Sequence, residues 1–288
     1  MAAAQPAARH DDRPETARRI WLVADDYGIS RSVNAAIRDL LERGAINATS
    51  VMVVASGFDT GEAEKLLGSR AHGAIGLHLT LTAPFRPSLS GYEPTRNAGF
   101  FSLRDTFLAA VLGRLSTQML TAEIESQVAK FVAAFGRPPD FIDGHQHVHL
   151  FPRIDACLLS VVRRTVPGAW VRQCGRAPRS PLDRKALVLD LLSRRFRSQA
   201  RARGVATNPA FAGTYNFAAT ANFAELFPAF LNDLPDGAVI MCHPGTVDEE
   251  LVRNDTLTSL RESEYAFLGS DAFRRLLSER RYVLMEME

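Results

Sequence analysis

Three histidines at alternating positions form the stretch of the chain with the clearest capacity for chemistry. The run Asp143-Gly-His-Gln-His-Val-His149 holds three of the seven histidines and places a carboxylate two residues before the first of them. In an extended segment, His145, His147 and His149 would point the same way. Neutral imidazole is the commonest protein ligand of divalent metals, and a nearby carboxylate can orient it. The run therefore predicts a metal site, although a solvated histidine-rich loop is an alternative interpretation.

Further polar residues stand at the ends of hydrophobic segments elsewhere in the chain. With the run, the set comprises Asp25, Asp26, His78, Asp143, His145, Arg172 and His243. Each of the added residues also has a purely structural interpretation. The two aspartates are consistent with a helix N-cap, His78 with a hydrogen-bonded core residue, and His243 with the turn before Pro244. Whether they form one site depends on the fold.

Strand-like and helix-like segments alternate along the chain. The strand-like segments are 19–24, 48–54, 74–81, 141–143, 170–172, 210–212, 238–242 and 282–285. The helix-like segments are 32–43, 62–67, 103–115, 121–135, 152–164, 181–203, 222–231 and 271–279. The stretch 84–100 has no periodicity and is expected to be a long loop.

This alternation predicts an α/β fold with a parallel sheet that is covered on both faces. We expect a single irregular (β/α) barrel, TIM-like and with about seven parallel strands, over residues 19–288. A doubly wound open sheet is the alternative, but no Gly-x-Gly-x-x-Gly follows the first strand. Residues 1–18 are expected to form a disordered leader, because they contain no apolar segment of the kind found in secretory signals.

In such a barrel, the polar residues at the ends of the strands would meet at one pole. A carboxylate with two imidazoles binds one divalent ion, such as Zn²⁺, Mn²⁺, Co²⁺ or Mg²⁺, and leaves positions open for water and substrate. The ion would lower the pKa of a bound water, a second carboxylate would accept its proton, and a separate histidine would protonate the leaving group. The spacing predicts metal-assisted hydrolysis but does not decide which histidine of the run is a ligand.

The composition excludes several classes of protein. The net charge of the 288 residues is +2, which gives no indication of a nucleic-acid partner. The three cysteines are far apart and odd in number, which favours a reducing compartment over a disulfide framework. No apolar stretch approaches the roughly 20 residues that span a bilayer. We expect a cytoplasmic protein. A homodimer is compatible with the sequence.

The chain resembles the YdjC-like carbohydrate deacetylase family, whose best-known members are chitooligosaccharide deacetylases. Four motifs carry the resemblance, in the family's order: Val23–Gly28 (VADDYG), Gly76–Leu79 (GLHL), Asp143–His149 (DGHQHVH) and His243–Gly245 (HPG). The resemblance implies an irregular (β/α) barrel related to other polysaccharide deacetylases. It also implies removal of the acetyl group from an N-acetylated amino sugar, with release of acetate.

The resemblance implies roles for single residues as well. Asp26, His78 and His145 resemble the family's metal ligands. Asp25 resembles the base that activates water, and His243 resembles the acid.

Five residues are candidates for contact with the sugar: Tyr27, Arg172, His147, His149 and Tyr215. For His147 and His149 this follows from the ligand assignment, which leaves them beside the metal or facing the substrate. For Tyr27, Arg172 and Tyr215 a structural role is equally consistent with the sequence.

Two loop segments, Arg96–Phe101 and Gly213–Phe217, resemble the hopanoid-biosynthesis-associated branch of the family. This likeness implies an N-acetylglucosaminyl hopanoid lipid as substrate rather than a chitooligosaccharide. The segment 181–203 mixes arginines with leucines, a pattern typical of helices that lie on an anionic membrane surface. A barrel helix with a buried leucine face and a solvated arginine face is the alternative.

Two other functions are compatible with such a rim. A phosphoesterase or amidohydrolase is disfavoured, because amidohydrolases carry a His-x-His pair on the first strand, where this chain has Asp25-Asp26. A non-catalytic barrel that binds a sugar or lipid would require a closed metal site. Three ligands and a spare carboxylate favour an open one.

Overall fold

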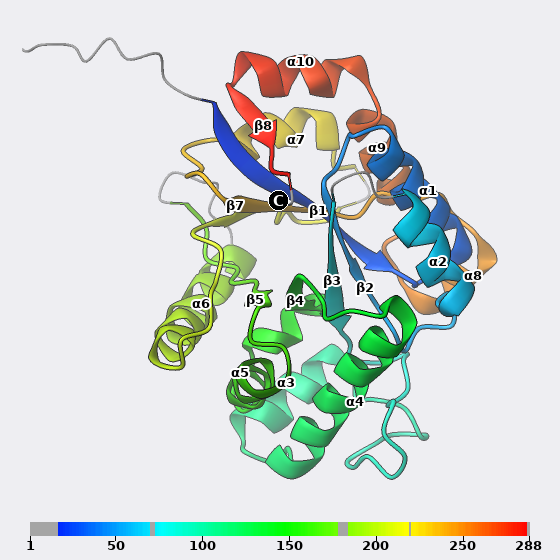
Figure 1. Ribbon diagram of the computed structural model, residues 1–288, viewed down its shortest axis with the longest axis vertical. Coiled ribbons are helices and arrows are strands. Elements are labelled where there is room, and N and C mark those ends of the chain that lie inside the picture. Colours follow the sequence, from blue (N-terminus) through cyan, green and yellow to red (C-terminus); the bar gives the residue numbers. More distant parts are fainter. Residues whose placement is uncertain (1–16, 70–72, 178–183, 219, 287–288) are drawn as a thin grey trace, which may run out of the picture.

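The computed structural model describes residues 17–69, 73–177, 184–218 and 220–286, in which a curled parallel sheet is surrounded by helices (Figure 1). The strands are β1 (Arg18–Tyr27), β2 (Ala48–Val51), β3 (Ala74–Leu79), β4 (Phe141–Gly144), β5 (Trp170–Val171), β6 (Phe211–Ala212), β7 (Ala238–Cys242) and β8 (Tyr282–Leu284). The helices are α1 (Arg31–Glu42), α2 (Thr60–Ser69), α3 (Leu103–Val111), α4 (Thr117–Phe135), η1 (a 3₁₀ helix, His145–Leu150), α5 (Ile154–Thr165), α6 (Arg184–Ala202), α7 (Phe223–Phe230), α8 (Glu249–Asn254), α9 (Ser259–Leu268) and α10 (Asp271–Glu279).

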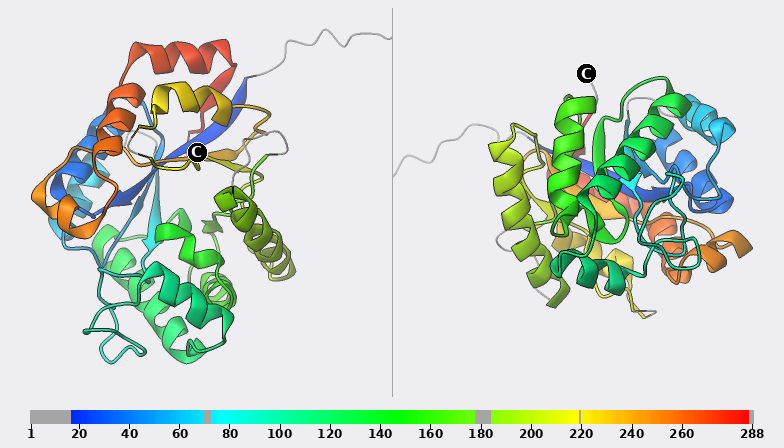
Figure 2. Two further views of the ribbon diagram at one scale, coloured as in Figure 1. Left: turned by 180° about the vertical axis from the view of Figure 1, so that it is seen from behind. Right: turned by 90° about the horizontal axis from the view of Figure 1, so that it is seen from below.

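The strands follow the order β5-β4-β3-β2-β1-β7-β6, and every pair is parallel. β8 pairs with the first residues of β1, on the edge opposite β7, because Ile20 pairs with both Ala238 and Leu284. Seen from two further directions, the helices lie outside the strands (Figure 2). Because the strands are parallel, their carboxyl ends gather at one pole.

Irregular contacts join the two ends of this strand order. The β5 segment reaches the β6 segment through isolated parallel bridges, Val171 to Thr207 and Arg176 to Phe211. The Phe211 N–H donates to the Gly175 carbonyl at 3.0 Å. The expected irregular (β/α) barrel is therefore confirmed, and the open doubly wound sheet is excluded.

Local sequence accounts for the main elements. From Ile20 onward every residue of β1 is buried, which explains its continuous hydrophobic run, because strands of a covered parallel sheet are buried on both faces. Ser30, Ser116 and Ser270 cap α1, α4 and α10 by accepting a backbone N–H with their hydroxyl groups. Gly136 ends α4 in the left-handed conformation, with a φ of 65°.

The structure departs from several of the sequence-based expectations. The strands expected at 48–54 and 74–81 end at Val51 and Leu79. Residues 1–16 of the expected leader and 181–183 of the expected basic helix lie outside the described residues, and Arg18 already belongs to β1. Helices α8 and α9 were not predicted at all. Within the described part of the chain, no helix is both long and apolar enough to cross a membrane.

Candidate active site

A β-bulge brings two adjacent aspartates to the same cavity. Ala24 pairs with Thr49 and Tyr27 pairs with Val51, so β1 uses one more residue than β2 between these two pairs. Asp26 adopts a left-handed conformation there, with a φ of 69°. Neighbouring side chains of a regular strand point to opposite faces, whereas a bulge re-aims one of them. Asp25 and Asp26 consequently both line the cavity at the carboxyl pole of the barrel.

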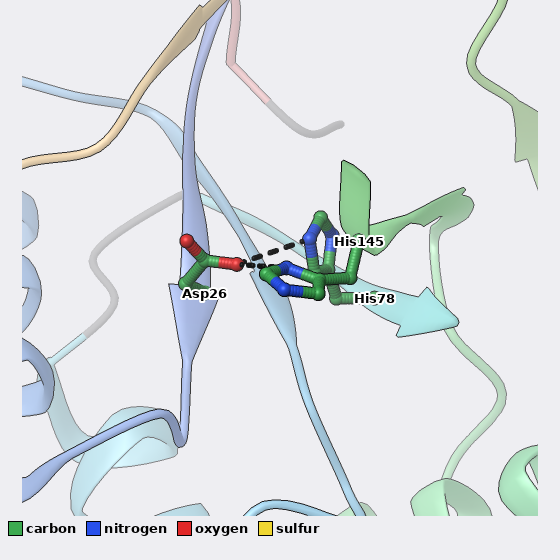
Figure 3. A group of neighbouring side chains, drawn as sticks. All are labelled: Asp26, His78 and His145. Carbon is green, nitrogen blue, oxygen red and sulfur yellow. Dashed lines mark hydrogen bonds and ion pairs between the residues drawn. The ribbon is translucent and has the colours of Figure 1, made fainter. Parts of the chain in front are cut away.

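Asp26 lies against two histidines from other elements (Figure 3). Its Oδ1 atom is 3.2 Å from Nε2 of His78 on β3 and 2.9 Å from Nδ1 of His145 on η1. All three residues are buried, and one ligand atom from each lies within 4.8 Å of the others. The three residues predicted as metal ligands are thus brought together by the fold.

The protonation pattern of this cluster fits a divalent cation. Nδ1 of His78 lies 2.6 Å from the Asp143 carboxylate, which can only accept, so Nδ1 donates and Nε2 is the nitrogen left to face Asp26 and an ion beside it. A carboxylate that orients a ligating histidine in this way is typical of metal sites. Burial alone would lower the pKa of His78, but the carboxylates of Asp143 and Asp25 raise it to about 10. The cluster therefore favours a positive charge, as a site for a metal ion must.

Arg172 links Asp25 to Asp143 beneath the cavity. It is fully buried, and its Nη1 and Nη2 atoms each donate to Asp25 at 2.7 Å. Nη2 also forms an ion pair with Asp143 at 2.6 Å. Burial raises the pKa of Asp25 above its ordinary value, and Arg172 opposes that rise. Arg172 thus holds the Asp25 carboxylate in one orientation, and Asp25 is one of the residues that line the cavity.

A second buried arginine holds Asp26. Nη2 of Arg261, on α9, donates to Oδ2 of Asp26 and to Oδ2 of Asp255, both at 2.6 Å. Burial alone would raise the pKa of Asp26, but Arg261 and His145 hold it well below its ordinary range. Because Arg261 occupies Oδ2, only Oδ1 faces the two histidines.

His243 follows β7 and lines the same cavity. Its backbone N–H donates to Oε2 of the buried Glu264 at 2.6 Å. Its imidazole meets the ring of Phe217 edge-on, with ring centroids 5.5 Å apart. Burial raises the pKa of Glu264 to about 7, although its partners Tyr215 and His243 oppose that rise.

Arg261 and Glu264 are the site residues that the sequence analysis missed. They lie three residues apart on α9, a helix that was itself not predicted. Opposite charges at this spacing are typical of an exposed helix face, so the pattern gave no indication that both are buried. The sequence signal that could have pointed to it is the spacing of Leu260 and Leu268, which lie four residues before and after Glu264 on the same helix face.

The histidine run does not form an extended segment. Residues His145–Leu150 form η1, and Gln146 and His147 have left-handed φ angles of 54° and 59°. The expectation that the three histidines point the same way is therefore wrong. His145 faces Asp26, while Nε2 of His149 lies 2.9 Å from the Arg172 carbonyl and must donate to it.

The five residues expected to contact the sugar divide into two groups. His147 lines the cavity, and its Nδ1 lies 3.5 Å from Sγ of Cys174. The other four are buried away from it: Tyr27, His149, Arg172 and Tyr215. The Tyr27 hydroxyl lies 3.0 Å from the Glu62 carboxylate, and the Tyr215 hydroxyl donates to Glu264 at 2.6 Å. Their placement corrects the expectation, because these side chains support the structure around the site instead of facing a substrate.

The cavity has a volume of about 230 Å³ and combines the polar cluster with apolar walls. Its lining residues are Asp25, Asp26, His78, Leu103, Gly144, His145, Gln146, His147, Phe217, Met241, His243, Asp255, Thr256 and Leu257. Asp25 and His243, which are outside this candidate ligand set, therefore line the same cavity as its three members. Such an arrangement can bind a metal ion and move protons to and from a substrate.

Comparisons with known proteins identify the family and the fold. A family model described as YdjC-like protein matches residues 19–279. Chitooligosaccharide deacetylases of Yersinia pestis (strain Pestoides F) and of Yersinia pseudotuberculosis serotype O:1b (strain IP 31758) are each 27% identical over 270 residues, which is 91% of this chain and 94% of theirs. A crystal structure from Enterococcus faecalis V583, of a candidate cellobiose-phosphate cleavage protein, superposes with a TM-score of 0.72 at 22% identity. It covers 94% of this chain and 98% of that one, and the two chains share a fold.

Removal of the Asp26 charge should abolish tight metal binding. We expect Asp26→Asn to weaken the affinity for Zn²⁺ or Mn²⁺ more than about 100-fold, because the carboxylate is the only anionic member of the cluster. The measurement is competition with a chromophoric chelator. Asp271→Asn is the control, since the Asp271 side chain is 78% exposed on α10. An unchanged affinity in Asp26→Asn would place the metal elsewhere.

His149 should make the fold sensitive to acid. Burial lowers its pKa from 6.5 to about 4, so the unfolded chain binds this proton more readily than the folded one. Between about pH 7 and about pH 5, this group alone should reduce the free energy of unfolding by about 2 kcal/mol. Urea denaturation of the metal-free protein should show that His149→Gln lacks this part of the loss. An equal loss in both proteins would refute the assignment.

Proposed function

Because the chain belongs to the YdjC-like protein family, we propose that it is a metal-dependent carbohydrate N-deacetylase. The enzyme hydrolyses the amide bond of an N-acetylated amino sugar and releases acetate and the free amine. One observation carries the proposal: Asp25 and His243 line the same cavity as the cluster of Asp26, His78 and His145. The names of the chitooligosaccharide deacetylases that the chain resembles support it.

The residues of the cavity divide the reaction between them. Asp26, His78 and His145 would hold the ion, which when bound supplies a Lewis acid that polarises the acetyl carbonyl and lowers the pKa of water. Asp25 accepts a proton from the attacking water, and Arg172 keeps its carboxylate in place for this step.

His243 lies on the wall that β7 contributes and donates a proton to the amine nitrogen as the carbon–nitrogen bond breaks. The water oxygen goes to acetate. The amine leaves protonated.

A metal site that only stabilises the fold would not need this arrangement. Structural sites are closed by four protein ligands, whereas this cluster has three and opens onto a cavity. Asp25, which is outside the candidate ligand set, is also held in place by the buried Arg172. These features favour an enzyme over a barrel that merely binds a sugar or lipid.

For the substrate, we propose an N-acetylglucosaminyl group on a hopanoid lipid. The likeness of the segments 96–101 and 213–217 to the hopanoid-associated branch supports this choice, and Phe217 from the second segment lines the cavity. A chitooligosaccharide is the second candidate, which the names of the Yersinia relatives favour.

The metal-loaded enzyme should release acetate from one of these N-acetylglucosaminides, and a chelator should stop the release. Asp25→Asn should bind the metal normally yet lose at least about 100-fold in turnover, because it removes the proton acceptor and leaves the ligands in place. Acetate is measured with a coupled assay on both substrate classes.

Asp271→Asn, the same chemical change on the surface, should keep full activity. Wild-type turnover in Asp25→Asn would refute its role as the base. Absence of acetate release from every N-acetylated sugar, with the metal bound, would refute the proposed function.

We propose further that the enzyme is cytoplasmic and reaches a lipid-linked substrate at a membrane surface through α6. In that helix Leu189 and Phe196 are buried against the barrel, so part of its apolar content serves packing. Leu187, Val188 and Leu191 nevertheless stay more than half exposed, at 53%, 52% and 69%. Large exposed apolar side chains on an arginine-rich helix are typical of contact with an anionic membrane.

Co-sedimentation with vesicles tests this contact. The protein should pellet with vesicles that contain phosphatidylglycerol and remain in the supernatant with neutral phosphatidylcholine vesicles. Leu191→Ser should weaken the binding severalfold, because each buried CH₂ contributes about 0.8 kcal/mol. Val252→Ser, which changes a residue 60% exposed on α8, is the matched control. Binding that depends neither on anionic lipid nor on Leu191 would contradict the proposal.

A further inference from the structure

Glu264 is a fully buried carboxylate that holds two groups beside the cavity without lining it. Its Oε2 atom accepts the backbone N–H of His243, and its Oε1 atom accepts the hydroxyl of Tyr215, both at 2.6 Å. The two donors come from different segments, one directly after β7 and the other after β6. Glu264 itself belongs to α9, so a single side chain ties three elements together.

The hydrogen bond to Tyr215 also restrains the imidazole of His243, through the ring of Phe217. The rings of Tyr215 and Phe217 lie with their centroids 4.1 Å apart, and Phe217 in turn meets the His243 ring edge-on. The segment is held close to β7 where it begins, because a Cβ atom at Gly213 would lie 2.1 Å from the Met241 carbonyl oxygen. Glu264 therefore restrains both the backbone and the ring environment of His243.

The helix that carries Glu264 also holds a candidate metal ligand. One turn earlier, Arg261 donates to Oδ2 of Asp26. Asp26 and His243 are thus both held by side chains from the same turn of α9, although Asp26 belongs to β1 and His243 follows β7. A small shift of α9 would move the proton donor and the candidate ligand together.

A buried carboxylate is costly unless its hydrogen bonds are satisfied, and apolar side chains could fill the same space. The aromatic residues around Tyr215 already pack this region, with Phe223 and Phe230 of α7 within 6.0 Å and 6.4 Å of its ring. Packing alone therefore does not account for a carboxyl group here. Its two hydrogen bonds, from the His243 N–H and from the Tyr215 hydroxyl, account for it.

We propose that Glu264 is a positioning residue that fixes His243 where it can protonate the leaving amine. The inference rests on the proposed function, since it assumes that His243 is the acid. Helix α9 thereby gains a role, although none of its described side chains lines the cavity. Glu264 acts on the reaction only through His243 and, by way of Tyr215, through Phe217.

The test compares Glu264→Gln with two other variants of the metal-loaded enzyme. Glutamine keeps the shape, and its oxygen can still accept from one donor, but its amide nitrogen cannot accept from the other, so the His243 N–H and the Tyr215 hydroxyl can no longer both be bound. We expect kcat to fall about 10- to 100-fold while KM changes less than about threefold, because placement of the acid matters only in the transition state. Tyr215→Phe removes one bond alone and should lower kcat by about three- to tenfold. Glu262→Gln, the same change at an exposed position of α9, should leave both constants unchanged.

Hydrogen exchange supplies a readout that does not depend on activity. The amide proton of His243 should exchange slowly in the wild type and markedly faster in Glu264→Gln, while the amides of α1 stay unchanged. A purely structural role predicts instead a lower melting temperature and a fall in activity that matches the fraction of unfolded protein. If Glu264→Gln fails to fold, Tyr215→Phe carries the test.

Wild-type kcat in a folded Glu264→Gln, or a loss expressed only in KM, would overturn the positioning role and leave the proposed function intact. A wild type that binds metal but releases no acetate would overturn the proposed function instead.

Discussion

Two fully buried arginines determine how the carboxylates of the site are placed. A guanidinium without access to water must be paired, and breaking one side of such a pair costs about 3–5 kcal/mol. Arg172 pairs with Asp25 and Asp143, and Arg261 pairs with Asp26 and Asp255. A carboxylate that turned away would leave its buried arginine with one partner fewer. The remaining features of the site follow from this constraint.

The same constraint shifts the pKa values of two chemically identical neighbours in opposite directions. Asp25 and Asp26 are adjacent in the chain and equally buried, yet burial raises the pKa of Asp25 while Arg261 and His145 lower that of Asp26. Groups of one type with opposed environments are typical of sites that divide acid–base work between them. The β-bulge makes the division possible, because without it the two side chains would point to opposite faces of the sheet.

Much of the fold could be predicted from the chain alone. The alternation of strand-like and helix-like segments gave the irregular barrel, because a buried parallel strand such as β1 requires a continuous hydrophobic run. Prediction failed where the sequence lacks such a signal. Helices α8 and α9 are short and rich in charge, and the polar face of α9 points inward at Arg261 and Glu264. A pattern of charges does not by itself state which side of a helix meets solvent.

The sequence by itself determined that the polar residues at the ends of the strands would meet, because the carboxyl ends of parallel strands converge at one pole whatever the details of the loops. The choice of Asp26, His78 and His145 among them came from the family resemblance. Only the tertiary structure decided what lies around them. The left-handed residues Gln146 and His147 turn the histidine run into η1, so that alternation no longer governs where its side chains point. Tyr27 and Tyr215 became supports because their hydroxyls found buried carboxylates. Such pairings join residues far apart in the chain, and the burial that makes them necessary exists only once the barrel has closed.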